Sequence, residues 1–315
     1  MISLTDIAIK LKKENSVAII CHIRPDGDCI GSSMALSLAL TSVGVKNQLF
    51  CEDVIPEKFV GIQYKYSQEF FGEYSCMVSV DCADIYRLGK FAEPFVRHKN
   101  TFNIDHHISN TKFAKVNYVN VTASNCENIY NLLVDGNIEI TKEIANFLLT
   151  GVVTDTGNFK HKNVTPNTLL IASKLLEKGA DLNKIVYDMF VNQTKRRATL
   201  FSSVMSKIRF MLENKLAIAT ITLKDLETNG AKPEDTEGFI DFLMTIDSVE
   251  VGVTLMEMKK NLYKVSFRSK GANVNEVASL FGGGGHILAS GCQINGEYEE
   301  IIDKLRYAIS QRIPE

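Results

Sequence analysis

No uninterrupted apolar run in this 315-residue chain approaches the roughly 18 residues that suggest a membrane-spanning helix. A basic excess is also missing, because the formal net charge is −2 at pH 7. Proteins that coat nucleic acid are usually basic, so small anionic ligands held in a local cationic pocket are the better expectation. The amphipathic segment Met1–Lys13 lacks the longer apolar core of a secretory signal. We therefore expect a cytoplasmic protein whose partners include neither a membrane nor a long nucleic acid.

The sequence also lacks a paired cysteine motif. The seven cysteines form no Cys-x-x-Cys pair and no regular spacing. Most of them, such as Cys21, Cys76 and Cys82, lie in or beside apolar strand-like segments. This pattern predicts buried free thiols in a reducing cytoplasm.

Short apolar segments alternate with helical patterns in the first half of the chain. Strands are expected at Ser16–Cys21, Gln48–Cys51, Cys76–Val80 and Thr101–Ile104, with a helix at Ile30–Val43. Alternation of this kind predicts a mostly parallel α/β sheet covered by helices. Ligands bind beyond the carboxyl ends of the strands in such sheets. Side chains that follow the strands are therefore expected to converge on one edge.

The second half has a different texture and is expected to form a smaller mixed α/β domain. Its predicted strands are Leu216–Leu223, Val249–Met256 and Tyr263–Arg268. Its predicted helices are Glu234–Asp247, Asn273–Phe281 and Glu297–Arg312. A polar, basic helix at Gln193–Arg209 is expected to connect the domains, with its Lys195-Arg196-Arg197 run on a solvated face; a phosphate contact is the alternative. The predicted boundaries are residues 1–190, a linker helix at 191–210, and residues 211–315.

Metal-binding side chains occur in four separate segments of the first half. The segments are His22-Ile23-Arg24-Pro25-Asp26-Gly27-Asp28, Val80-Asp81, Asp105-His106-His107 and Thr154-Asp155-Thr156-Gly157. Together they supply five carboxylates and three imidazoles. Clustered carboxylates repel one another and are costly to bury, and metal ions remove that conflict. Oxygen and imidazole donors suit Mn²⁺ or Mg²⁺, and two such ions point to hydrolysis, most often of phosphate esters.

Each of these motifs is weak alone. A single Asp-x-Asp is usually an exposed turn, and a single His-His pair is more often a polar pair than a ligand. The order of all four is specific, and it resembles the DHH phosphoesterase family across essentially the whole chain. The four matching segments are Val17–Ser32, Val78–Ala83, Asn103–His107 and Gly151–Phe159.

The resemblance implies a doubly wound catalytic domain with two Mn²⁺ ions, with Mg²⁺ as the weaker alternative. The ligands that it implies are His22, Asp26 and Asp81 for one ion, and Asp28, Asp81, His106 and Asp155 for the other. Asp81 would bridge the ions. Asp105 would orient a ligand, and His107 would face the scissile phosphate.

Four glycines and a histidine, Gly282-Gly283-Gly284-Gly285-His286, follow a predicted helix. Glycine weakens regular structure, so the run is expected to bring backbone N–H groups close to an anion, with a flexible loop as the alternative. It is not a P-loop, because no Gly-Lys-[Ser/Thr] follows. Arg268, at the end of the preceding strand, adds a cation that suits phosphate. The stretch Arg268–Gly291 resembles the DHHA1 domain, which accompanies one branch of the family.

The glycine loop separates this chain from family II inorganic pyrophosphatases. The chain is also too short for the 5′-exonuclease branch, which adds further domains. It lacks the sensor and transmembrane segments of membrane-bound cyclic-dinucleotide hydrolases. The remaining resemblance, to stand-alone nanoRNases, implies a two-metal phosphodiesterase and phosphatase. Such an enzyme degrades nanoRNA and dinucleotides to mononucleotides and dephosphorylates pAp.

Two other functions stay open. One is hydrolysis of c-di-AMP or pApA, and the other is a non-catalytic nucleotide sensor, although a sensor would be expected to have lost metal ligands. A homodimer is compatible with either. Ser124-Asn125-Cys126-Glu127 departs from the Ser-Thr that the family often has before the acidic residue, which puts a substrate contact in doubt.

Overall fold

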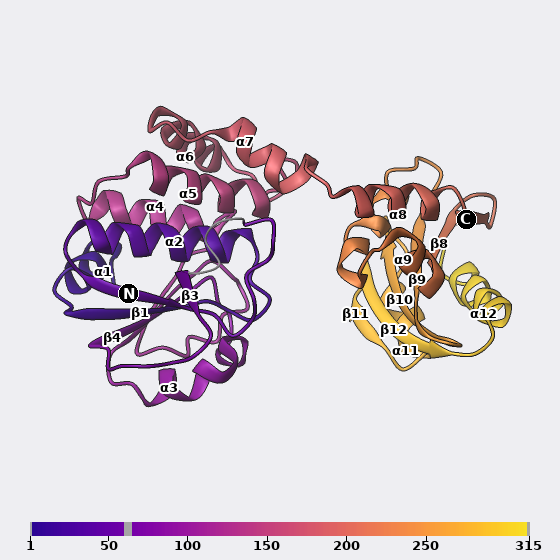
Figure 1. The fold of residues 1–315 in the computed structure, drawn as a ribbon, viewed down its shortest axis with the longest axis horizontal. Coiled ribbons are helices and arrows are strands. Elements are labelled where there is room, and N and C mark those ends of the chain that lie inside the picture. The colour runs from indigo at the N-terminus through magenta and orange to yellow at the C-terminus, as the bar shows by residue number, and fades with distance from the viewer. Residues whose placement is uncertain (1, 60–64, 314–315) are drawn as a thin grey trace. The chain divides into compact units, whose positions relative to one another are not determined.

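The computed structural model describes residues 2–59 and 65–313. The chain divides into two compact units, Met1–Asn192 and Gln193–Glu315 (Figure 1). Within the described ranges, no helix combines the length and the apolar character needed to cross a membrane.

The described part of the first unit contains a sheet of six parallel strands in the order β3-β2-β1-β4-β5-β6. The strands are β1 (Ser16–Ile20), β2 (Lys46–Phe50), β3 (Tyr66–Ser67), β4 (Cys76–Val80), β5 (Thr101–Asp105) and β6 (Val116–Val119). The chain moves outward from β1 on one side and from β4 on the other. This order confirms the predicted doubly wound sheet and places its switch point between β1 and β4, where such folds bind ligands.

Helices cover both faces of this sheet (Figure 1). One face carries α1 (Leu4–Leu11), α2 (Gly27–Ser42), α4 (Asn125–Asp135) and α5 (Lys142–Asp155), followed by α6 (Pro166–Glu177), α7 (Leu182–Val186) and the π-helical turn η3 (Tyr187–Val191). The other face carries the 3₁₀ helix η2 (Ile85–Phe91) and α3 (Ala92–Arg97). Alternate residues of β1 supply the two cores: Val17 and Ile19 pack beneath α2, whereas Ala18 and Ile20 pack against the opposite layer.

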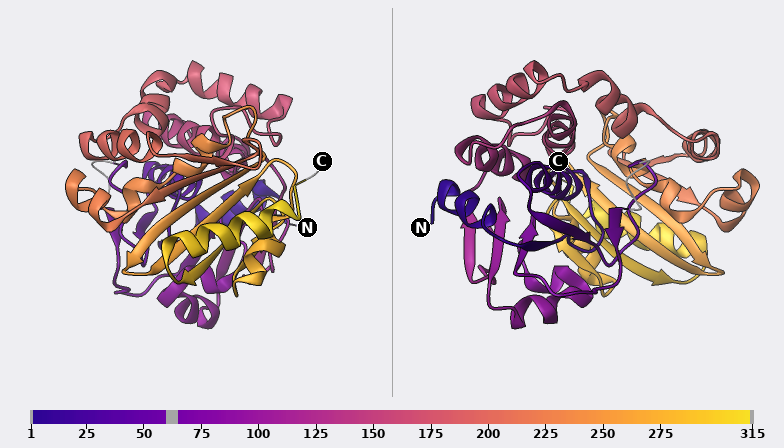
Figure 2. Two further views of the ribbon diagram at one scale, coloured as in Figure 1. Left: turned by 90° about the vertical axis from the view of Figure 1, so that its right-hand side faces the viewer. Right: turned by 60° about the vertical axis from the view of Figure 1, so that its left-hand side comes forward.

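The second unit has a mixed sheet in the order β11-β12-β10-β9-β8-β7, in which β8 and β9 are parallel and the other neighbours are antiparallel. Its strands are β7 (Arg209–Met211), β8 (Leu216–Ile221), β9 (Val251–Lys259), β10 (Leu262–Ser269), β11 (Gly284–His286) and β12 (Ala289–Asn295). On one face lie α11 (Val274–Leu280) and α12 (Tyr298–Ser310), and Figure 2 shows α12 lying over the strands. On the other face lie α8 (Lys195–Met205), α9 (Leu223–Asn229), η4 (Pro233–Thr236) and α10 (Phe239–Leu243). The second unit is the smaller mixed α/β fold that the sequence predicts.

Two predicted helices of the second half differ from the structure. The expected helix Glu234–Asp247 is divided into η4 and α10, because Gly238 between them has a left-handed φ of 78°. The helix expected at Gln193–Arg209 is α8, and its Leu200 and Val204 are buried in a core of the second unit. Because these two apolar side chains are buried, α8 is an amphipathic helix that packs on the sheet of the second unit.

The basic run of α8 also differs from the expected solvated face. Arg196 Nε donates to Asp235 Oδ2 over 2.9 Å, and Arg197 Nη1 donates to the Asp235 carbonyl over 3.0 Å. Arg197 also lies over the Phe239 ring. These arginines therefore hold η4 and α10 in place.

Candidate metal centre and phosphate-binding face

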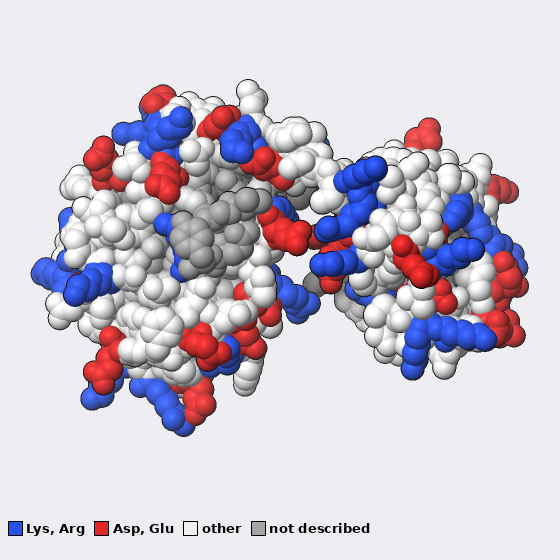
Figure 3. Space-filling model, in the orientation of Figure 1, with Lys and Arg blue, Asp and Glu red and all other residues white. Residues whose placement is uncertain are grey.

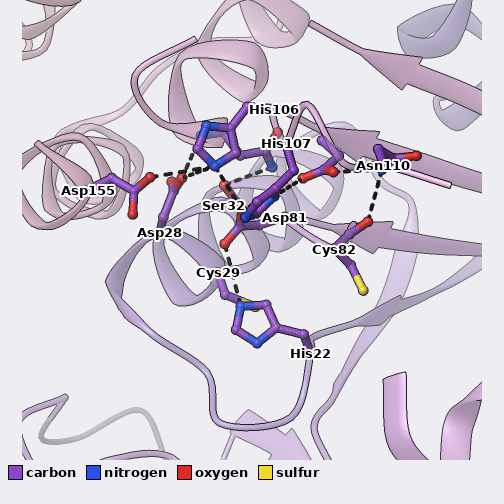
Figure 4. A network of polar contacts seen from close by, with 12 residues as sticks. His22, Asp28, Cys29, Ser32, Asp81, Cys82, His106, His107, Asn110 and Asp155 are labelled. Carbon is purple, nitrogen blue, oxygen red and sulfur yellow. Dashed lines mark hydrogen bonds and ion pairs between the residues drawn. The ribbon is translucent and has the colours of Figure 1, made fainter. Parts of the chain in front are cut away.

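The metal-binding motifs meet at the carboxyl edge of the first sheet, at its switch point (Figure 4). His22 follows β1, Asp81 follows β4, and Asp105 is the last residue of β5. Asp81 has a φ of 54°, a left-handed conformation that is uncommon outside glycine but tolerated by Asp. Its backbone N–H still donates to the Ile104 carbonyl over 3.0 Å, so the turn begins directly at the strand end. Three segments that are distant in sequence therefore form one edge.

Asp81 lies at the centre of the cluster and is only 2% exposed. Its Oδ2 is 3.6 Å from His22 Nε2, and its Oδ1 is 3.3 Å from His106 Nε2 and 3.7 Å from His107 Nδ1. Burial alone would raise the Asp81 pKa, but His106 and His22 lower it to about 2. Among the buried side-chain atoms of the described residues, Oδ1 has no hydrogen-bond partner. An ionised, buried oxygen without a partner is costly, and a cation would remove that cost.

His106 has one ring nitrogen directed at the cluster. Its Nδ1 donates to the Thr122 carbonyl over 3.0 Å, so Nε2 faces the cluster, and loss of the Nε2 proton would expose a lone pair there to a metal ion. Nε2 is 3.5 Å from Asp155 Oδ2 and 3.8 Å from Asp28 Oδ2. Burial favours the neutral ring, but the carboxylates of Asp81 and Asp28 raise the His106 pKa to about 10. The imidazolium thus occupies the position of positive charge that the acid cluster requires.

Asp28 is held by the N-terminus of α4. Its carboxylate accepts from Ser124 Oγ at 2.7 Å, from Asn125 N at 2.5 Å and from Cys126 N at 3.0 Å. Burial, followed by repulsion from Asp81, nevertheless raises the Asp28 pKa to about 6. Asp155, at the end of α5, has its pKa raised to about 8 by burial and then by the Asp28 and Asp81 carboxylates. The raised pKa values show that the protein alone does not balance the ionised forms of these acids, and a divalent cation would provide that balance.

Asp26 differs from the other acids because its side chain is 58% exposed. Its Oδ1 caps α2 by accepting from the N–H groups of Asp28 and Cys29, each over 3.1 Å. Its Oδ2 stays free of the cap and lies 3.9 Å from His22 Nε2. Asp26 is therefore placed at the open side of the cluster.

Three groups of donor atoms in the described chain lie mutually within 4.8 Å. The groups are Asp28, His106 and Asp155; Asp81, His106 and His107; and His22, Cys29 and Asp81. The first matches most of one ligand set that the family resemblance implies. In the third, Cys29 stands where Asp26 was expected. Cys29 directly follows Asp28 in the sequence. Its proximity to His22 could not be predicted, because it depends on which way the first turn of α2 directs the Cys29 side chain.

His107 is oriented by a buried acid. Its Nδ1 lies 2.8 Å from Asp105 Oδ1, and Asp105 Oδ2 accepts from Asn110 Nδ2 at 2.6 Å. The hydrogen bond with Asp105 is the main reason that the His107 pKa is raised. Asp105 was expected to orient a metal ligand, and its imidazole partner in the structure is His107.

The sequence did not indicate two residues whose side chains contact the cluster, Asn110 beside Asp105 and Arg87 beside His22. Asn110 belongs to the loop after β5, and Arg87 belongs to η2, with its Nη2 2.9 Å from His22 Nδ1. Neither lies in a metal-binding motif. Asn125 also faces inward: its side chain is buried and donates to Ser32 Oγ over 3.2 Å. Its departure from the family pattern therefore lies within the packing of α2 and α4.

The predicted phosphate-binding residues share one face of the second sheet. Arg268, Ala289 and His286 form one row across β10, β12 and β11. Arg268 points away from its buried neighbour Phe267, and its Nε lies 3.8 Å from Asp241 Oδ1. A cavity of about 150 Å³ lies on this face, lined by Arg268, Lys264, Ser266, Thr254 and others. The structure thus brings Arg268 and His286 onto one side of the sheet.

The glycine run is more ordered than the predicted anion-binding loop. Gly282 N donates to the Ser279 carbonyl and Gly283 N to the Ala278 carbonyl, which ends α11. Gly284–His286 then forms β11 against β12. A Cβ at Gly283 would collide with the Gly291 carbonyl oxygen. Close approach to β12 explains the need for glycine there, and two of the N–H groups expected to face an anion are already bonded.

A carboxylate and imidazole cluster at the switch point of a doubly wound sheet is a site suited to metal-dependent hydrolysis. The model of the DHH family N-terminal domain matches residues 16–152, and the DHHA1 domain model matches residues 213–313. The chain is 31% identical to the bifunctional oligoribonuclease and PAP phosphatase NrnA of Thermus thermophilus, over 95% of this chain and 91% of that protein. It therefore belongs to the DHH phosphoesterase family, which confirms the resemblance read from the motifs.

Two further comparisons agree. The bifunctional oligoribonuclease and PAP phosphatase NrnA of Bacillus subtilis is 25% identical over 92% of this chain and 93% of that protein. The crystal structure of an exopolyphosphatase-related protein from Bacteroides fragilis has a TM-score of 0.86 and 25% identity, covering 98% of this chain and 96% of that chain. The similarity thus spans both units.

Proposed function

We propose that this protein hydrolyses very short oligoribonucleotides to mononucleotides and dephosphorylates pAp, with two Mn²⁺ ions bound in the first unit. One observation carries the metal dependence: the ionised Asp81 carboxylate is buried among imidazoles and has one oxygen without a hydrogen-bond partner. The substrate assignment is supported by the relatives, which are named oligoribonuclease and PAP phosphatase. The seven described cysteines are free and buried, which supports a reducing cytoplasm.

The donor atoms support two cation positions that share Asp81. We assign His22, Asp26 and Asp81 to one ion, and Asp28, Asp81, His106 and Asp155 to the other. When bound, two divalent ions neutralise charge on phosphoryl oxygens and lower the pKa of a water. Carboxylate and imidazole donors favour Mn²⁺, with Mg²⁺ binding more weakly.

The remaining residues act on the substrate. His107 is fixed through Nδ1 by Asp105, so its Nε2 is free to hold a proton for the leaving oxygen. In the second unit, Arg268 and His286 share an open face and would bind a terminal phosphate or base. Gly284 pairs with Gly291 in the neighbouring strand. Because neither residue has a side chain, this part of the same face is open to a ligand.

One panel of substrates tests this proposal. Purified protein is freed of metal with EDTA, reloaded with Mn²⁺ or Mg²⁺, and assayed on pAp, pApA, c-di-AMP, pyrophosphate and RNA of graded length. We expect hydrolysis of dinucleotides and pAp, higher activity with Mn²⁺, and no activity after chelation. Full activity in protein shown to be metal-free would refute the metal assignment. If c-di-AMP alone were hydrolysed rapidly, the proposed substrates would be wrong and c-di-AMP would take their place. If the protein bound these compounds but hydrolysed none of them, it would be a nucleotide sensor.

A further inference from the structure

One donor group in the first unit contains a sulfur atom. His22, Cys29 and Asp81 offer a nitrogen, a sulfur and an oxygen that lie mutually within 4.8 Å. Each residue is no more than 2% exposed. Cys29 occupies the first turn of α2, and its backbone N–H donates to Asp26 Oδ1 over 3.1 Å. The cap that positions Asp26 therefore also fixes Cys29 beside the cluster.

The opposite side of the cluster offers different chemistry. Asp28, His106 and Asp155 supply only carboxylate oxygens and an imidazole nitrogen. Thiolate ligands select softer ions such as Zn²⁺, whereas carboxylates suit Mn²⁺ and Mg²⁺. A thiolate on one side would therefore widen the range of metals that this side binds, whereas the other side would keep its preference for Mn²⁺ and Mg²⁺.

Asp81 gives an independent reason to place cations on both sides. Its Oδ2 faces His22, and its unpartnered Oδ1 faces His106. Both oxygens are buried with the residue. A buried carboxylate directed to two groups of donors can serve both, and one of the groups contains the thiol.

We propose that Cys29 is an additional metal ligand on the His22 side of the cluster, which lets that side bind a thiophilic divalent ion such as Zn²⁺ or Co²⁺ as well as Mn²⁺. The inference rests on the proposed function, because both use Asp81 as a shared ligand. When the sulfur–metal bond forms, the thiol proton is released to solvent and the sulfur binds as thiolate. The Asp28 side keeps its preference for Mn²⁺.

Two other buried thiols lie nearby and serve as matched controls. Cys126 Sγ is 3.8 Å from the Asp28 carbonyl and 3.4 Å from Ser32 Oγ. Cys21 directly follows β1 and precedes His22, and its thiol hydrogen-bonds with the thiol of Cys29. Neither belongs to a donor group of the described chain. Cys21→Ser and Cys126→Ser therefore remove a similar buried thiol without removing the proposed ligand.

The first experiment loads metal-free protein with Co²⁺ alone and records its absorption. We expect a thiolate-to-cobalt charge-transfer band in the near ultraviolet for the wild type. Cys29→Ser should abolish the band and weaken Zn²⁺ binding by about tenfold or more, by analogy with the loss of groups that support metal sites. Cys21→Ser and Cys126→Ser should retain the band. Elemental analysis and circular dichroism establish metal content and folding for each variant.

The second experiment needs no substitution. X-ray absorption of the wild type loaded with Zn²⁺ alone should show sulfur at about 2.3 Å besides nitrogen and oxygen at about 2.0–2.2 Å. Bound metal with only nitrogen and oxygen neighbours would overturn the role of Cys29 and leave the proposed function intact. A band that disappears in Cys21→Ser or Cys126→Ser but survives in Cys29→Ser would also overturn it. Protein that binds none of Mn²⁺, Co²⁺ and Zn²⁺ would overturn both proposals.

Discussion

Asp81 combines a left-handed backbone, near-complete burial and a low pKa, all directly after a central strand. Strained backbone conformations at such positions often belong to functional sites, because the surrounding structure must stabilise them. The described residues within ion-pair distance of its carboxylate are the imidazoles of His22, His106 and His107. Imidazoles can exchange a proton for a metal ion, so the surroundings of Asp81 suit a site that gains and releases cations.

Replacing Asp81 should separate activity from folding. Asp81→Asn keeps the shape of the side chain but removes the charge that both donor groups share. We expect metal content to fall and kcat/KM to drop by roughly a thousandfold or more, an effect of about 4 kcal/mol. Asp84→Ala is the control, because Asp84 caps η2 by accepting from Tyr86 N over 2.9 Å. Near-normal turnover by folded Asp81→Asn protein would contradict the shared-ligand assignment.

Asp105→Asn tests the orientation of His107. The substitution preserves volume but replaces the acceptor that fixes Nδ1 of the imidazole. We expect kcat to fall by about 10²–10⁴-fold, the usual contribution of a positioned acid or base. KM and metal content should change little, because Asp105 is bonded to His107 and not to His106. Loss of bound metal with unchanged kcat would instead place Asp105 in support of the metal ligands.

The sequence indicated the acids and imidazoles of the cluster because each motif follows a strand or ends a helix. Cys29, Arg87 and Asn110 were not indicated. Their proximity to His22 or Asp105 depends on the phase of α2 and on how the segments after β4 and β5 fold back. Such long-range placement has no local signal in the sequence.

At the scale of elements, alternation of strands and helices was enough to predict a parallel sheet with ligands at its carboxyl edge. The glycine run was harder to interpret. Glycine signals either an open loop or close backbone approach, and the structure shows close approach of Gly283 to β12. Only the pairing of β11 with β12 distinguishes an open loop from close backbone approach. The sequence does not reveal β11, because a strand of three residues shows no alternation of apolar and polar side chains.

The open face of β10 and β11 predicts separable kinetics. Arg268→Ala and His286→Ala should each raise KM, or lower kcat/KM, by about tenfold, with metal content unchanged. Arg306→Ala is the matched control, because Arg306 lies on α12, which covers the opposite face of the same sheet. The measurement is steady-state kinetics on a dinucleotide together with elemental analysis. Metal loss in His286→Ala would mean that the metal site had been assigned to the wrong half of the chain.

Asp235 predicts a pH-dependent contribution to stability in the second unit. Burial disfavours its ionised form, but Lys232 N–H and then the Arg196 guanidinium lower its pKa below the ordinary value. A lowered pKa stabilises the fold above the unfolded value of about 3.9, and this stability is lost as pH falls through the folded pKa. Asp235→Asn should therefore cost about 1–2 kcal/mol at pH 7 and much less at an acidic pH well below the unfolded pKa of about 3.9. Urea denaturation at both pH values measures this, and an equal cost at both would exclude the ion pair as its source.

At the scale of the whole molecule, the change in texture between the halves predicted two folds. The connecting helix was harder to assign, because its polar composition hid the two apolar positions that pack in the second unit, Leu200 and Val204. Basic and acidic side chains are interspersed on the face of each unit drawn in Figure 3. No continuous basic track crosses that face, which agrees with a net charge of −2.

Substrate length should follow from this charge distribution. Grip on a polymer needs many cations along the backbone, and binding through them is strongly salt-dependent. Here the proposed contacts are the metal cluster, Arg268 and His286, which suffice for one scissile phosphate and one end of a ligand. Rates should therefore be highest on about two to five nucleotides, a range that also follows from the family resemblance, with little salt dependence because few phosphates are contacted. The check is turnover on RNA of graded length at low and high salt. Processive degradation of a 24-mer as fast as a dinucleotide would show contacts to distant nucleotides that these few groups do not provide.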